Sequence, residues 1–334
     1  MFIRKMTTLA AVAAVSLGAM GTFAADAAAK EFKLAYFMGS KHPMNKAVFT
    51  PFAKKLAQVS GGKLTVKQFA GGALNSKPPA QYAILRKGVA DVAFALPGYT
   101  AKTFPMTNVI TLPGLSSSAL DGTKKLLNAR QILEKEYKAK VLAIWANQPP
   151  VLLTKNRAVR TMADLKGMKI RVTAKQNVPF IEALGARALA QPVTVINQNL
   201  QNGTIDGILI GASAIRSFKL HEPAKYLTTG IPGSGSAFVL LMNQKAYNAL
   251  SAQEKKWVDQ ASDESLSLMG GRGFDAAAAK GMTLAKKSGV EIIALPDGEV
   301  AKIDQAMESA IEKFKSSKVG SMMAGDVVKA MMGN

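Results

Sequence analysis

Two kinds of hydrophobic pattern alternate along most of the chain, and this alternation constrains the fold more than any other feature. The strand-like segments 31–37, 63–70 and 89–99 are separated by the helix-like segments 43–62 and 78–88. This order is typical of parallel strands joined by right-handed crossovers. We therefore predict an α/β fold.

A second series of the same kind runs from the strand-like segment 140–146 to the strand-like segment 205–211. The two series share the spacing L-x-x-G-x-x-D, at 85–91 and 200–206, and an apolar strand follows each copy. In both copies the glycine can end a helix in a left-handed conformation before the chain enters the sheet. The sequence thus predicts two similar α/β lobes.

The C-terminal part of the chain predicts that both lobes are discontinuous in sequence. An apolar strand at 238–243 follows the glycine- and serine-rich segment 230–237. Ser251 and Glu254 form a capping box that opens a long helical stretch toward Lys287. If the late strand returns to the first lobe, the predicted limits are 28–148 plus about 237–276 for lobe 1, and 149–236 plus about 277–334 for lobe 2.

The N-terminus has the three parts of a secretory signal peptide. Arg4 and Lys5 precede an apolar run from Leu9 to Phe23, and small residues follow at 24–27. A membrane anchor is the alternative, but spanning a bilayer takes about 20 apolar residues and this run is shorter. We predict that residues 1–27 are removed and that the mature chain lies in an extracytoplasmic space.

Composition and charge narrow the classes of function. Apolar residues make up 48% of the chain and charged residues 19%, which is typical of a globular protein with a substantial core. The net charge of +21 falls by one to +20 when Arg4, Lys5 and Asp26 leave with the signal peptide. The lysines are scattered, without a basic stripe interleaved with aromatic residues, so we predict an anion-attracting surface and no nucleic-acid partner.

The residues that enzymes use for chemistry are scarce. The chain has no cysteine, which excludes disulfides, thiol catalysis and thiolate metal sites. Its two histidines, His42 and His221, are far apart in sequence and have no carboxylate at ligand spacing. Neither a phosphate-binding loop nor a dinucleotide fingerprint occurs. We therefore predict no catalytic residue, no metal and no cofactor.

Arg171 stands out in the segment LKGMKIRV at 165–172. Met168, Ile170 and Val172 alternate with polar residues, which predicts a strand with one face in the core. An arginine there is costly unless it lies at an edge, at a strand end or opposite an anion. A solvated strand face and an internal salt bridge are the structural alternatives.

Five segments resemble the DctP-type solute-binding proteins of TRAP (tripartite ATP-independent periplasmic) transporters. They are ADLKGMKIRV at 163–172, NQNLQNGTIDGI at 197–208, the segments 71–94 and 98–115, and LSAQEKKWVDQAS at 250–262. The resemblance implies a two-lobed α/β periplasmic binding protein with a ligand cleft between the lobes, strands crossing between them and a long helix in the C-terminal half. It also implies an organic anion as ligand, and the small and large integral membrane subunits of a transporter as partners.

In that family the arginine of this strand pairs with the ligand's carboxylate, which implies that Arg171 is the anchor. A planar guanidinium suits this role because it can donate two parallel hydrogen bonds. The other expected cleft residues are mostly apolar, which favours a monocarboxylate with an apolar or aromatic body. These expected residues are Tyr99, Ile210, Leu96, Val151, Phe37, His42 and Ser213.

Three alternatives stay open at this point. The apolar positions can simply pack the core. The receptor can instead serve a tripartite tricarboxylate transporter or an ABC-type importer. It can also be a ligand sensor that docks on a membrane signalling protein.

Overall fold

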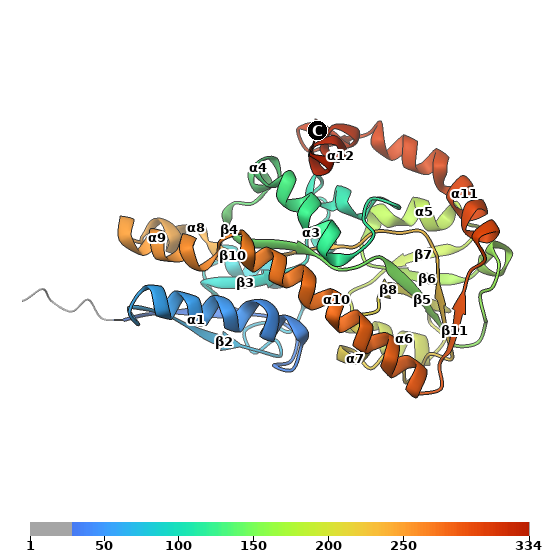
Figure 1. The fold of residues 1–334 in the computed structure, drawn as a ribbon, viewed down its shortest axis with the longest axis horizontal. Coiled ribbons are helices and arrows are strands. Elements are labelled where there is room, and N and C mark those ends of the chain that lie inside the picture. Colours follow the sequence, from blue (N-terminus) through green and yellow to red (C-terminus); the bar gives the residue numbers. More distant parts are fainter. Residues whose placement is uncertain (1–28, 334) are drawn as a thin grey trace, which may run out of the picture.

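The computed structural model describes residues 29–333, so the predicted signal peptide lies outside the described residues. Its strands form one five-stranded and one six-stranded sheet, with a short hairpin of β12 (Lys318–Val319) and β13 (Met322–Met323) near the C-terminus. Figure 1 shows the two sheets beside each other along the long axis of the molecule, with helices packed around them. The architecture is that of two α/β lobes.

The first sheet has the strand order β2-β1-β3-β10-β4. Its strands are β1 (Lys30–Ala35), β2 (Leu64–Phe69), β3 (Val92–Ala95), β4 (Ala139–Ala146) and β10 (Ala237–Asn243). β1 pairs in parallel with β2 and β3, as the strand–helix alternation predicts. β10 comes from much later in the sequence and pairs antiparallel with both β3 and β4. A late strand therefore returns to the first sheet.

The second sheet has the order β11-β9-β5-β8-β6-β7. Its strands are β5 (Pro150–Thr154), β6 (Lys169–Val172), β7 (Arg187–Ala190), β8 (Gly207–Gly211), β9 (Tyr226–Thr229) and β11 (Glu291–Ala294). β6 is parallel to both of its neighbours, β7 and β8, so it is an interior strand. Consecutive strands pass from one sheet to the other at three connections: β4–β5, β9–β10 and the long helical connection β10–β11.

The two copies of the L-x-x-G-x-x-D spacing have the same structure. Gly88 and Gly203 follow the helices α2 (Gln81–Arg86) and α6 (Ile196–Gln201) with φ angles of 74° and 73°. Asp91 and Asp206 each accept a hydrogen bond of 2.8 Å from the backbone N–H of a lysine in a neighbouring strand. The prediction of glycine-capped helices is confirmed in both lobes.

The long helical stretch predicted from Ser251 toward Lys287 is two helices rather than one. The capping box at Ser251 and Glu254 is present and opens α9 (Ala252–Ala261). The helix breaks at residues 262–263, where the Asp263 side chain accepts from the N–H of Ser265 and starts α10 (Glu264–Lys287). The prediction of a single helix was wrong because an aspartate cap restarts the helix within an otherwise continuous helical pattern.

Helix α10 joins the two lobes. It packs against α3 (Ala119–Asn128) and β4 on the first lobe and against α7 (Ala214–Ser217) on the second, as Figure 1 shows. Gly270 allows the close approach to the first lobe: a Cβ there would lie 2.6 Å from the ring of the fully buried Trp145. The glycine-rich stretch at 270–273 is therefore a tight packing point.

Three of the remaining α-helices pack against strands of the two sheets: α1 (Thr50–Val59), α5 (Val178–Glu182) and α8 (Gln244–Asn248). The other three pack mainly against further helices: α4 (Arg130–Leu133), α11 (Asp297–Lys315) and α12 (Ala324–Met332). Helix α11 packs against α5 in the second lobe, whereas α12 packs against α3 in the first lobe. The lobe limits inferred from sequence stay a prediction, and α12 is the element that fits them least.

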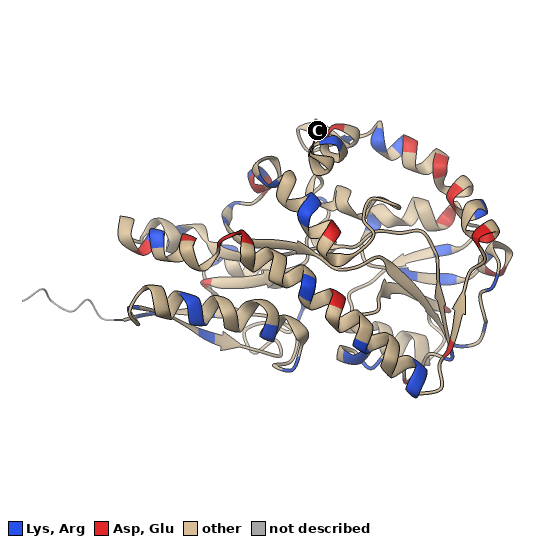
Figure 2. Ribbon diagram, viewed as in Figure 1, with Lys and Arg blue, Asp and Glu red and all other residues tan. Residues whose placement is uncertain are grey.

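Three general features of residues 29–333 bear on function. Figure 2 shows Lys and Arg spread over helices and strands of both lobes, interspersed with Asp and Glu. Within this range no helix has both the length and the apolar character needed to cross a membrane. The same range has no group of three or more His, Asp or Glu side chains that could hold a metal ion.

Candidate ligand pocket between the two sheets

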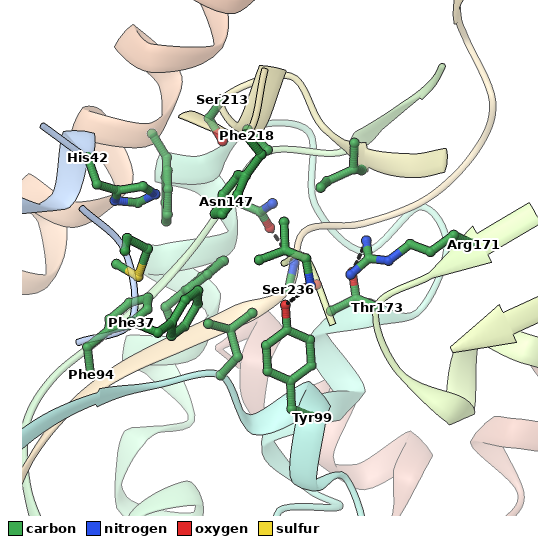
Figure 3. Close-up of a pocket in the computed structure, with 17 residues that line it drawn as sticks. Phe37, His42, Phe94, Tyr99, Asn147, Arg171, Thr173, Ser213, Phe218 and Ser236 are labelled. Atoms are coloured by element: carbon green, nitrogen blue, oxygen red, sulfur yellow. Dashed lines mark hydrogen bonds between the residues drawn. The ribbon is translucent and has the colours of Figure 1, made fainter. Parts of the chain in front are cut away.

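A cavity of about 510 Å³, including its open mouth, lies where the two sheets face each other (Figure 3). Phe94 on β3 and Phe238 on β10 contribute walls from the first lobe. Arg171 on β6 and the residue Ile210 on β8 contribute walls from the second. Asn147 lies on the connection between β4 and β5.

Arg171 is almost fully buried, with only 1% of its surface exposed. It lies near the carboxyl end of the interior strand β6, paired with Leu189 on one side and Ile208 on the other. The carbonyl oxygen of Gln191 accepts hydrogen bonds from its Nε and Nη2, at 2.9 and 2.7 Å. Neither a sheet edge nor a solvated face therefore explains this arginine.

The charge of Arg171 has no anionic partner among residues 29–333. Its hydrogen bonds all go to neutral acceptors, which are two carbonyl oxygens and the hydroxyl of Thr173 at 3.2 Å. No carboxylate of the described residues forms an ion pair with it. Burial lowers the pKa of Arg171, and the nearby Tyr99 hydroxyl opposes that shift. An arginine stays protonated even so, so the pocket contains an uncompensated positive charge.

Tyr99 borders the pocket beside this charge. It lies in a single helical turn, Pro97–Thr100, directly after β3. Its hydroxyl accepts a hydrogen bond of 3.0 Å from the backbone N–H of Val193 in the second lobe. Burial raises the pKa of Tyr99, although the Arg171 cation opposes this. The hydroxyl therefore keeps its proton and can donate a hydrogen bond to an anion held by Arg171.

Three further polar residues of the pocket were missed by the sequence analysis: Asn147, Thr173 and Ser236. Oδ1 of Asn147 accepts a hydrogen bond of 2.6 Å from the backbone N–H of Ser236, which links the β4–β5 connection to the β9–β10 connection. Thr173 could have been found, because it lies two residues after Arg171 and so shares its face of the strand. Asn147 and Ser236 lie in loops that carry no such signal.

The opposite side of the pocket is aromatic. Phe238 lies 5.7 Å from Phe94 and 4.8 Å from Phe274 between ring centroids, and Phe37 lies 5.9 Å from Phe94. Phe218 adds a fifth ring from the segment after α7. Of these five, only Phe37 was expected from sequence. The other four have the pattern of ordinary core residues, so nothing in the sequence separates them from the core.

Seven of the eight residues expected at the ligand site line this one pocket. They are Arg171, Tyr99, Ile210, Leu96, Phe37, His42 and Ser213. Val151 does not line it: it pairs with Ile210 across β5 and β8, and its side chain is buried in the hydrophobic core. β5 is one strand further from β6 than β8 is, which explains the difference. The ligand-binding role of the seven stays a prediction.

Comparison with known proteins identifies the family. Residues 34–317 match the model of the bacterial extracellular solute-binding proteins, family 7. The chain belongs to this family. It is a solute-binding receptor of the TRAP transporter type, and the resemblance noted in its sequence is confirmed.

Solved structures of family members share the two-lobed fold. A TRAP solute-binding protein from a marine metagenome, specific for aromatic acids and crystallised with 3-hydroxybenzoate, is 29% identical, with 91% of this chain and 97% of that chain covered and a TM-score of 0.84. Another from Rhodoferax ferrireducens T118, with copurified benzoate, is 27% identical over 90% and 96% of the chains, with a TM-score of 0.83. The predicted fold is confirmed.

A third structure limits what the fold alone can say. The sugar acid binding protein of Advenella mimigardefordensis, in complex with galactonate, is 24% identical over 92% of this chain and 99% of that chain, with a TM-score of 0.82. Its likeness shows the fold and nothing about the ligand. A choice between an aromatic acid and a sugar acid as ligand therefore depends on the residues that line the pocket.

Proposed function

We propose that this solute-binding protein takes up an aromatic monocarboxylate, with the carboxylate on Arg171 and the ring among the phenylalanines. The observation that carries the proposal is the buried guanidinium without an anionic partner. A buried charge is stable only when it is paired and hydrogen-bonded, and a ligand carboxylate would complete it. Tyr99 and Thr173 flank the guanidinium and offer hydroxyl groups to the same carboxylate.

The aromatic wall supports a ring rather than a polyol. A phenyl group that buries roughly 150 Å² gains about 4 kcal/mol from the hydrophobic effect. A sugar acid would instead place hydroxyl groups against Phe94, Phe238 and Phe274, where each unpaired hydroxyl costs about 1–3 kcal/mol. The two aromatic-acid-binding relatives are consistent with this choice. A dicarboxylate is disfavoured because Arg171 is the only cationic side chain of the pocket among the described residues.

We further propose delivery to the small and large membrane subunits of a TRAP transporter from the periplasm. Family membership supports this, whereas a tricarboxylate-type partner, an ABC-type partner and a sensor role have no specific support. Catalysis has none either, since the only titratable side chains among the described residues of the pocket are Arg171, Tyr99 and His42. The charge of +20 on the mature chain would speed the capture of any anion and does not select among them.

Calorimetry and thermal shift with matched acids test the proposal. We expect benzoate to bind more tightly than gluconate or succinate. Saturation at 100 times the dissociation constant should then add about 2.7 kcal/mol to the free energy of unfolding. Tighter binding of gluconate or succinate would refute the aromatic assignment. Binding of no carboxylate at all would refute the receptor proposal as a whole.

A further inference from the structure

His42 lies on the side of the pocket away from Arg171, as Figure 3 shows. Its ring meets two of the pocket phenylalanines edge-on, with centroid distances of 6.2 Å to Phe218 and 6.3 Å to Phe274. An imidazole is therefore set into the aromatic wall, far from the cation. The proposed pairing of a ligand carboxylate with Arg171 leaves the imidazole of His42 without a function.

The local backbone determines which nitrogen of His42 carries the proton. A helical turn begins at Pro43, directly after His42. Proline has no N–H, so the first helical N–H that needs an acceptor is that of Met44. Nδ1 of His42 accepts this hydrogen bond at 3.3 Å. Because Nδ1 is an acceptor, the proton of the neutral ring lies on Nε2.

The Nε2–H group has no hydrogen-bond acceptor among residues 29–333. The one hydrogen bond that the ring makes within this part of the chain is the contact of Nδ1 with Met44. Burial lowers the pKa of His42 from 6.5 to about 4, so the ring is neutral at physiological pH. His42 thus presents a neutral N–H donor within a largely aromatic wall.

From this geometry we infer that the ligand is an aromatic acid whose ring bears an oxygen acceptor, and that Nε2–H of His42 donates to it. Ether, carbonyl and hydroxyl oxygens on the ring meet this requirement. An amino substituent does not, because an aromatic amine is a poor acceptor and would place its N–H groups against the donor. The inference rests on the proposed function, since it needs the carboxylate on Arg171 to direct the far side of the ring toward His42.

Pairs of ligands of nearly equal shape test the inference. We would compare 3- and 4-methoxybenzoate with 3- and 4-ethylbenzoate by calorimetry at pH 7. At one of the two ring positions the methoxy acid should bind about fivefold more tightly, the ratio that a net hydrogen bond of about 1 kcal/mol gives. Equal affinity of methoxy and ethyl acids at both positions would overturn the inference.

Variants of the two histidines assign the effect to its residue. His42→Phe keeps a ring between Phe218 and Phe274 but removes the donor. The preference for the methoxy acid over the ethyl acid should then fall below twofold. His221→Gln is the matched control, because His221 does not line the pocket, and it should keep the full preference. A preference that persists in His42→Phe would overturn the inference.

A spectroscopic measurement gives an answer even if His42→Phe fails to fold. Nitrogen-15 NMR of the histidine-labelled wild-type protein should show Nε2 of His42 protonated and Nδ1 bare. Methoxybenzoate should shift the Nε2 signal more than ethylbenzoate does. A proton on Nδ1, or identical shifts with both ligands, would overturn the inference. If benzoate binds in an Arg171-dependent way without any oxygen preference, only the His42 assignment falls; if no aryl carboxylate binds, the proposed function falls with it.

Discussion

Replacing Arg171 by methionine removes the pocket's cation while keeping an unbranched side chain of comparable length. Losing the partner of a desolvated carboxylate costs about 2–5 kcal/mol, which is roughly a 30-fold to several-thousand-fold loss of affinity. We therefore expect Arg171→Met to weaken the binding of benzoate in calorimetry by about 30-fold or more. The loss is this large because the guanidinium is only 1% exposed, so water cannot take its place as the partner of the buried carboxylate.

The same substitution should have a small effect on the unliganded protein. The variant loses the hydrogen bonds of the guanidinium to the carbonyls of Gln191 and Leu209 and to the hydroxyl of Thr173, but it also removes a buried charge that lacks an anionic partner. These effects have opposite signs and similar size, so the urea midpoint should change little. The matched control is Lys169→Met on the same strand, whose ammonium group bonds the carbonyl of Gly203 outside the pocket. Near-wild-type affinity in Arg171→Met, or lost affinity in Lys169→Met, would refute the reasoning.

Two further predictions concern stability. Gly270→Ala would place a methyl group 2.6 Å from the ring of Trp145, so we expect the free energy of unfolding in urea to fall by about 1–3 kcal/mol. The control is Gly298→Ala, which has open space around it and should be neutral or slightly stabilising. Equal effects of the two substitutions would contradict the packing argument. Because the pKa of His42 is lowered to about 4, the unfolded chain binds more protons than the folded one between about pH 6.5 and 4. The contribution of His42 to the free energy of unfolding is therefore complete above pH 6.5 and is lost as the pH falls toward 4. In urea unfolding at pH 7, 5.5 and 4.5, the free energy of unfolding should fall less for His42→Phe than for the wild type. Parallel decreases in the two proteins would contradict a buried neutral ring.

Local patterns in the sequence predict most of the secondary structure and single out Arg171. Alternating patterns placed the strands, and the glycines of the two L-x-x-G-x-x-D copies end their helices with positive φ angles. Arg171 was identifiable because a charge within an apolar strand violates the local pattern. Such violations are visible in sequence because they contrast with their immediate neighbours.

Only the tertiary structure decided what faces Arg171 across the pocket. Phe94, Phe238 and Phe274 come from β3, β10 and α10, and each by itself is indistinguishable from a core residue. Val151 shows the converse, because pairing with Ile210 on β8 leaves it in the core, one strand further from the pocket. The physical reason is the same in each case. Periodicity is a property of neighbouring residues, whereas the side chains that border a cavity are chosen by contacts between segments far apart in the chain.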